Sequence, residues 1–261
     1  MLKDTEIGLL NDINSVLWPI PFTGERIQLG YVHILDQIAF MTNTPNVEYI
    51  LEVNSERVDW TSFLSELQSL PNVRGIRGTR LHMEDLLGFP NLEIVGLGDN
   101  CDIFEAGAFP KLKYLSGSFD EGTRGIENAP ELKILSMGFS PSKKFDFDSL
   151  LGLSSLEYLK IILGRYENLK FLRNCKKLRV LNLEPATWLQ ELQGLSALEK
   201  LEILLLERGK KVRDWDKFPY LENLSIVQFN ECGEMNLPAS LEHHPAFVNG
   251  NYYKSKPVFG R

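Results

Sequence analysis

The sequence lacks a long hydrophobic run and a basic or apolar leader. Apolar runs such as residues 203–206 are far shorter than the roughly 20 apolar residues that a membrane-spanning helix needs. The first six residues include the acids Asp4 and Glu6, whereas a secretory leader begins with basic residues and continues with an apolar segment. These absences predict a cytoplasmic protein that does not bind membranes.

Cysteine is scarce, and basic residues are outnumbered. Cys101, Cys175 and Cys232 are odd in number and far apart, which predicts free thiols in a reducing compartment. The chain has 28 Lys and Arg against 35 Asp and Glu, a formal net charge of -7. A nucleic-acid-binding protein needs a basic surface to displace counterions from phosphates, so the composition argues against a nucleic-acid partner.

The sequence also lacks a recognisable catalytic constellation. Gly96 and Gly98 begin a dinucleotide-binding fingerprint, but Cys101 stands where the third glycine belongs. His243 and His244 are adjacent, and adjacent residues rarely converge on one metal ion, so we expect both to face solvent. We predict no enzymatic activity, no cofactor and no metal. A remote alternative is a hydrolase whose site lies in the C-terminal segment around these histidines.

What the sequence does contain is one phrase repeated along most of its length. The phrase occurs at residues 90–97, 110–117 and 130–137. Each copy reads proline, polar, leucine, charged, aromatic or β-branched, aliphatic, small, and then a last core slot. The phrase recurs at intervals of about 20 residues between Pro45 and Pro219, and such a recurrence is the signature of a repeat architecture. Its core slots follow Leu-x-x-Leu-x-Leu, for which we expect Leu92, Val95 and Leu97; Leu156, Leu159 and Ile161; Leu178, Leu181 and Leu183; Leu198, Leu201 and Ile203; and Leu221, Leu224 and Ile226.

This pattern resembles the leucine-rich repeat family, specifically its short-repeat branch and the stand-alone bacterial proteins within it. The resemblance implies an α/β solenoid shaped as a horseshoe, with a parallel β-sheet on the concave side and short helical or irregular segments on the convex side. We expect an N-terminal cap over residues 1–44, about nine repeats over 45–235, and a C-terminal cap and tail over 236–261. Local patterning predicts helices over 4–17 and 59–70 and a strand over 25–32.

The concave face is the predicted binding surface. Strand residues alternate between the two faces of a sheet, so residues between the core slots face the concave side. In the third to fifth repeats these slots hold only small residues, namely Gly96, Gly98, Ser116, Ser118, Ser136 and Gly138. We expect aromatic and aliphatic walls on both sides of this strip, although the aromatic rings could instead pack against each other or under a loop. The predicted partner-contacting residues are Tyr114, Phe119, Phe139, Tyr158, Ile134, Arg77, Arg80, Asp99 and Lys160.

These observations favour a non-catalytic module that binds one specific protein and is a monomer when free. A narrower hypothesis, based on the family resemblance, is an immunity protein or an inhibitor whose partner is a toxin or an enzyme. The alternative is an adaptor or a translocated effector that engages host or signalling proteins.

Overall fold

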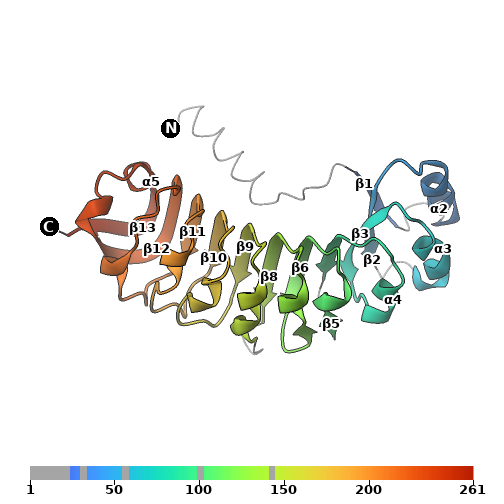
Figure 1. Ribbon diagram of the computed structural model, residues 1–261, viewed down its shortest axis with the longest axis horizontal. Helices are drawn as coiled ribbons and strands as arrows, with labels where there is room; N and C mark the ends of the chain where they lie inside the picture. Colours follow the sequence, from blue (N-terminus) through green and yellow to red (C-terminus); the bar gives the residue numbers. More distant parts are fainter. Residues whose placement is uncertain (1–23, 30–33, 55–58, 99–102, 141–144, 261) are drawn as a thin grey trace.

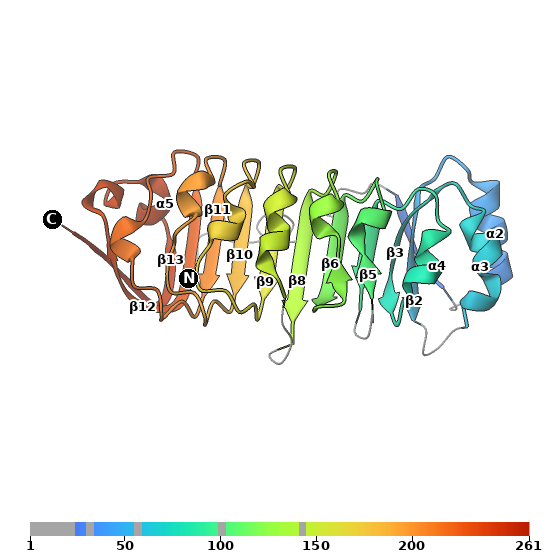
Figure 2. The ribbon, with the colours of Figure 1, turned by 60° about the horizontal axis from the view of Figure 1, so that its bottom comes forward.

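A computed structural model describes residues 24–29, 34–54, 59–98, 103–140 and 145–260. The predicted helix over 4–17, and residues Asp99 and Cys101, lie outside these ranges. The described chain forms an eleven-stranded sheet in the order β1-β2-β3-β4-β6-β8-β9-β10-β11-β12-β13. Every neighbouring pair in this sheet is parallel. Figure 1 shows the sheet as a curved layer, and Figure 2 shows short helical segments along its outer side. The predicted leucine-rich repeat solenoid is therefore confirmed.

The strands of the main sheet are β1 (Glu25–Gln28), β2 (Tyr49–Asn54), β3 (Val73–Thr79), β4 (Ile94–Leu97), β6 (Tyr114–Phe119), β8 (Ile134–Phe139), β9 (Tyr158–Ile162), β10 (Val180–Glu184), β11 (Ile203–Glu207), β12 (Ile226–Leu237) and β13 (Asn251–Phe259). A second, two-stranded parallel sheet consists of β5 (Phe104–Glu105) and β7 (Thr123–Arg124). The α-helices are α2 (Ile34–Asn43), α3 (Leu64–Gln68), α4 (Met83–Leu87) and α5 (Pro245–Val248). The 3₁₀ turns are η1 (Thr61–Phe63), η2 (Ala106–Ala108), η3 (Ile126–Asn128), η4 (Phe147–Gly152), η5 (Lys170–Leu172), η6 (Leu195–Ala197), η7 (Trp215–Lys217) and η8 (Ala239–Leu241).

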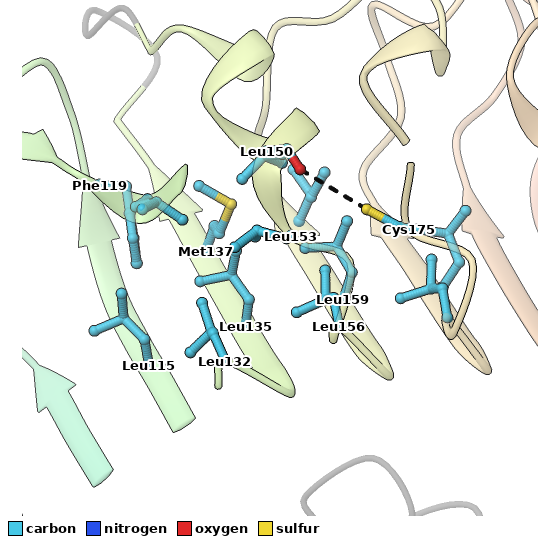
Figure 3. Close-up of a cluster of buried hydrophobic side chains, with 14 of the residues drawn as sticks. Leu115, Phe119, Leu132, Leu135, Met137, Leu150, Leu153, Leu156, Leu159 and Cys175 are labelled. Carbon is cyan, nitrogen blue, oxygen red and sulfur yellow. Dashed lines mark hydrogen bonds between the residues drawn. The ribbon is translucent and has the colours of Figure 1, made fainter. Parts of the chain in front are cut away.

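The hydrophobic core lies between the sheet and the outer segments. Leu115, Leu135 and Leu159 occupy equivalent slots in β6, β8 and β9 and are fully buried. Figure 3 shows them in one layer of the core, with Leu153 of the outer segment near Leu159. Because one repeat cannot bury its apolar face alone, each repeat depends on its neighbours for stability.

Both ends of the described sheet carry additional elements. The predicted strand over 25–32 is present as β1, and α2 follows it. At the other end β13 adds an eleventh strand, with Phe229 of β12 paired to Tyr252. The predicted helix over 59–70 forms as η1 followed by α3. The precise limits of caps and repeats, at residues 44 and 235, remain a prediction.

The core slots expected in the eighth and ninth repeats are wrong by three residues. Strand pairing places Leu181 opposite Leu204, and Leu204 opposite Val227. The core slots are therefore Leu201, Leu204 and Leu206, followed by Leu224, Val227 and Phe229. Ile203 and Ile226 instead belong to the concave face. The leucine-rich segment 198–206 fits the repeat phrase in two registers, and hydrogen bonding between strands selects the later one.

Charged residues immediately before the strands form ion pairs between neighbouring repeats. Lys113 lies 2.7 Å from Glu93, and Arg179 lies 2.8 Å from Glu202. Exposed ion pairs of this kind each contribute little to the free energy of unfolding, about 0–1 kcal/mol. Their main effect is to favour the observed alignment of neighbouring strands. Separately, none of the described helices is long and apolar enough to span a membrane.

Candidate functional site

The predicted strip of small residues forms a continuous surface on the concave face. Gly96, Ser116 and Ser136 pair across β4, β6 and β8, and Ser118 pairs with Gly138 one step further along the strands. We call the six residues Gly96, Gly98, Ser116, Ser118, Ser136 and Gly138 the small-residue floor. Strands lie about 4.8 Å apart, so the floor is roughly 14 Å wide across three strands. Its lack of large side chains leaves the backbone of β6 and β8 open to close approach, whereas Gly96 of β4 is buried.

The row formed by Gly96, Ser116 and Ser136 is bordered at each end by a cation on the neighbouring strand. Arg77 pairs with Gly96 on one side, and Lys160 pairs with Ser136 on the other. The Arg77 side chain lies over Gly96, because a Cβ atom at that glycine would be 2.8 Å from Arg77 Cγ. Both cations therefore lie in the same residue row as the floor and frame it.

Acidic residues hold both of these cations in place. Arg77 Nη1 lies 3.9 Å from Glu52 Oε1, and Lys160 Nζ lies 3.0 Å from Glu184 Oε2. A cavity of about 270 Å³ opens beside Arg77 and is lined by β1, β2 and β3 residues that include Glu52 and Asn54. The two cations are thus preorganised, and each can still donate a hydrogen bond to an acceptor group of a partner.

One long side of the floor is an apolar row that we call the concave ladder. Its members pack against one another and are separate from the interior core; they are Ile50, Ile94, Tyr114, Ile134, Tyr158, Val180 and Ile203. Leu205 packs with them from the neighbouring row, where it pairs with Asn182. Tyr114, Ile134 and Tyr158 therefore lie on the predicted face. They do not form an exposed wall, however, because the exposed fraction of Tyr114 is 2% and that of Tyr158 is 4%.

The hydroxyl groups of the concave ladder are in an apolar setting. Burial raises the pKa of Tyr158, and repulsion from an ionised Tyr114 and from the Glu184 carboxylate raises it further. Within the described part of the chain, the buried Tyr114 hydroxyl has no hydrogen-bond partner. A buried hydroxyl without a partner costs free energy, so Tyr114 carries an unused polar group at the side of the floor.

The expectation that Phe119 and Phe139 form the opposite wall is wrong. Both belong to the interior core, where the exposed fraction of Phe119 is 1%, and Figure 3 shows Phe119 beside Leu115 and Met137. The period of two in β6 continues to the last residue of the strand, so positions 115, 117 and 119 all point inward. The alternative in which the aromatic rings pack against each other is the one observed.

The two remaining predicted site residues lie apart from the floor or outside the described residues. Arg80 is exposed and follows the end of β3, where its backbone has a φ of 53°. Asp99 lies outside the described residues. The structure therefore brings Tyr114, Ile134 and Tyr158 together with Arg77 and Lys160 around the floor.

The expectation that both C-terminal histidines face solvent is wrong for His244. This residue is buried, with Nε2 lying 3.0 Å from the Leu221 carbonyl oxygen and Nδ1 accepting from the Ala246 N–H. With Nδ1 as the acceptor of the Ala246 N–H, Nε2 is the ring nitrogen that donates to the Leu221 carbonyl. His243 is exposed. Among the described residues, no group of three His, Cys, Asp or Glu side chains could hold a metal ion.

The sequence reasoning missed a cation and aromatic cluster on the loops that follow β9, β10 and β11. The charged groups of Arg165 and Lys211 lie 5.2 and 4.7 Å from the ring centroid of Trp188. The three residues are equally spaced in the sequence and occupy the same loop in consecutive repeats. That spacing is the signal that could have revealed the cluster.

Comparison with known proteins gives similarity in structure alone. No protein family model matches the chain, and no curated protein matches its sequence. Internalin F from Listeria monocytogenes is similar over 85% of this chain and 65% of its own, with 16% identity and a TM-score of 0.52. Internalin C2 from the same species covers 63% of this chain and 74% of its own, with 20% identity and a TM-score of 0.49. The Leptospira interrogans leucine-rich repeat protein LIC12759 covers 95% and 76%, with 14% identity and a TM-score of 0.41. The internalin F match supports the fold.

Proposed function

We propose that this leucine-rich repeat solenoid is a non-catalytic module that binds one specific protein through the small-residue floor. The observation that carries the proposal is the floor itself, a strip of Gly and Ser in register across three strands. Its width of roughly 14 Å, part of which lies under the Arg77 side chain, is close to the diameter of a single helix with its side chains, about 10–12 Å. We infer that a helix or loop of the partner lies there.

The surroundings of the floor suit a preformed interface. The concave ladder packs the sheet rigidly on one side, and ion pairs hold Arg77 and Lys160 at the ends. A surface that is already ordered loses less conformational entropy on binding. The Ser116 and Ser136 hydroxyls and the two cations supply hydrogen-bond donors for the polar backbone of a partner segment.

The finer hypothesis is that the partner is a toxin or an enzyme that this protein inhibits in the cytoplasm as a monomer. The family resemblance supports it, and the two buried free thiols, Cys175 and Cys232, are compatible with a reducing compartment. The second candidate is an adaptor or translocated effector that engages host or signalling proteins. The activity of the bound partner separates the two: an inhibitor abolishes that activity in a one-to-one complex, whereas an adaptor leaves it intact.

Affinity capture with floor variants tests the proposal. The floor variant carries Ser116→Gln and Ser136→Gln, which add uncharged bulk at two paired positions of the concave face. The control carries Ser196→Gln, a similar change at an exposed position of η6 on the outer side. Circular dichroism confirms that both variants are folded.

The expected result is a single stoichiometric protein that binds the wild type and the control but not the floor variant. Capture of the same protein by all three would place recognition on another surface and contradict the proposal.

A further inference from the structure

Trp188 forms a second surface feature, away from the floor. It lies in the loop that follows β10 and is 42% exposed, unlike Trp60 and Trp215, which are buried. Arg165 comes from the preceding repeat and Lys211 from the following one, and both cations contact the ring. A cation over a tryptophan ring is attracted by the negative face of the π-system. Trp188 thus holds two positive charges close together on the surface; we call these three residues the Trp188 cluster.

The positive charge of this cluster is uncompensated. Arg165 and Lys211 are exposed, and neither forms an ion pair with a carboxylate of the described residues. By contrast, Arg77, Lys113 and Arg179 each have such a partner. Lys211 also lies in the segment 208–213, which places four basic residues within six positions of a chain whose net charge is -7. Of these four, Arg208 is paired with Glu207 and Glu231.

We propose that the Trp188 cluster is a docking surface for an acidic segment of a partner protein. Each of the two cations can form a charge-assisted hydrogen bond to a carboxylate. Trp and Arg are also among the residue types enriched at the centres of protein interfaces. Charge complementarity selects the partner, because the cluster is locally basic on an otherwise acidic molecule.

A protein segment fits this surface better than a nucleic acid. Single-stranded nucleic acids stack their bases on open aromatic rings, whereas the two cations already occupy the Trp188 ring. The cluster also presents two charges rather than the extended basic groove that a phosphate backbone follows. The proposal does not depend on binding at the small-residue floor, since the floor lies on β4, β6 and β8.

The test is a titration of the ¹⁵N-labelled full chain with hexaglutamate at low salt, followed through the Trp188 indole N–H signal. A Trp188→Phe variant assigns the signal, and hexaglutamine is the uncharged control peptide. The charge variant carries Arg165→Gln and Lys211→Gln. The matched control carries Lys176→Gln and Lys256→Gln, which remove the same charge from sites outside the Trp188 cluster. A thymidine oligonucleotide of equal charge serves as the nucleic-acid probe.

The proposal predicts a saturable shift with hexaglutamate and none with hexaglutamine. The charge variant should bind hexaglutamate about tenfold more weakly, as expected for the loss of two exposed ion pairs, while the matched control binds like the wild type. An unchanged indole signal, undiminished binding by the charge variant, or tighter binding of the oligonucleotide than of hexaglutamate would each overturn it.

Discussion

The rings of Phe119 and Phe139 lie 6.4 Å apart, centroid to centroid, on adjacent strands inside the core. Phe145 contacts both rings, at 6.3 and 5.2 Å. Further ring contacts extend the cluster through Phe147 to Phe171. These phenylalanines therefore link the cores of neighbouring repeats, and they stabilise the solenoid rather than contact a partner.

Replacing Phe119 by Ala should destabilise the protein severely. Removal of a buried phenylalanine leaves a cavity that the rigid stack cannot fill, and such changes cost about 3–5 kcal/mol. Urea unfolding measures the free energy directly. Tyr253→Ala is the control, because that ring is 58% exposed and its loss should change the free energy of unfolding by less than about 0.5 kcal/mol. A Phe119→Ala protein as stable as the control would contradict the core assignment.

Asn72 ties the second repeat to the preceding loop, so Asn72→Ala should also destabilise the fold. Its buried side-chain amide donates to backbone carbonyl oxygens at 3.0–3.2 Å, which belong to Met41, Thr44 and Val47. Removing the amide takes the side-chain donor from the Val47 carbonyl, while the Met41 and Thr44 carbonyls still accept from the Thr44 and Val47 N–H groups. The expected cost is about 1–3 kcal/mol.

The matched control for this change is Asn91→Ala in the next repeat. Asn91 makes a comparable bond to the Pro71 carbonyl, but in an exposed setting where water can replace the amide. We expect a loss below about 1 kcal/mol by the same unfolding assay. Equal losses for the two variants would show that burial of the Asn72 amide is unimportant.

The thiols of Cys175 and Cys232 should react slowly in the native protein. Burial raises the pKa of Cys175 to about 12 and that of Cys232 to about 11, so few thiolates exist near pH 8. In a Cys101→Ser background, a disulfide reagent should modify the native protein at least about 100-fold more slowly than the urea-unfolded chain. Rapid reaction of both thiols under native conditions would be inconsistent with their burial.

The same thiols predict a loss of stability at alkaline pH. Their folded pKa values lie above the ordinary value of 9.0, so above pH 9 the unfolded chain loses these protons first. The free energy of unfolding should therefore fall as the pH rises from 9 towards 11. Urea unfolding at several pH values tests this. A Cys175→Ala, Cys232→Ala variant should show a shallower fall, and an identical slope would exclude the thiols as the cause.

The repeat phrase was sufficient to predict the solenoid, because Leu156, Leu159 and Ile161 match the observed core slots without correction. It could not decide the register of the eighth repeat, where both Leu198 and Leu201 begin an acceptable phrase. Strand pairing, which the sequence does not display, selects Leu201.

The candidate site was predictable in part. The small-residue floor follows from the alternation of strand residues, as do the positions of Arg77 and Lys160. Phe119 was placed wrongly because the alternation of β6 continues to its last residue, which puts Phe119 on the inner side. Trp188 was missed because its contacts join residues from three repeats, and their equal spacing of 23 residues was the one sequence signal that linked them.

The most direct test of the proposed binding face is calorimetric measurement of the dissociation constant for the captured partner. The three proteins to compare are the wild type, the Ser116→Gln, Ser136→Gln floor variant and the Ser196→Gln control. Because two glutamines prevent close approach to the sheet backbone, we expect the floor variant to bind at least about 100-fold more weakly, a loss of about 2.7 kcal/mol. The control should bind like the wild type. Equal dissociation constants for all three proteins would contradict recognition through the concave face.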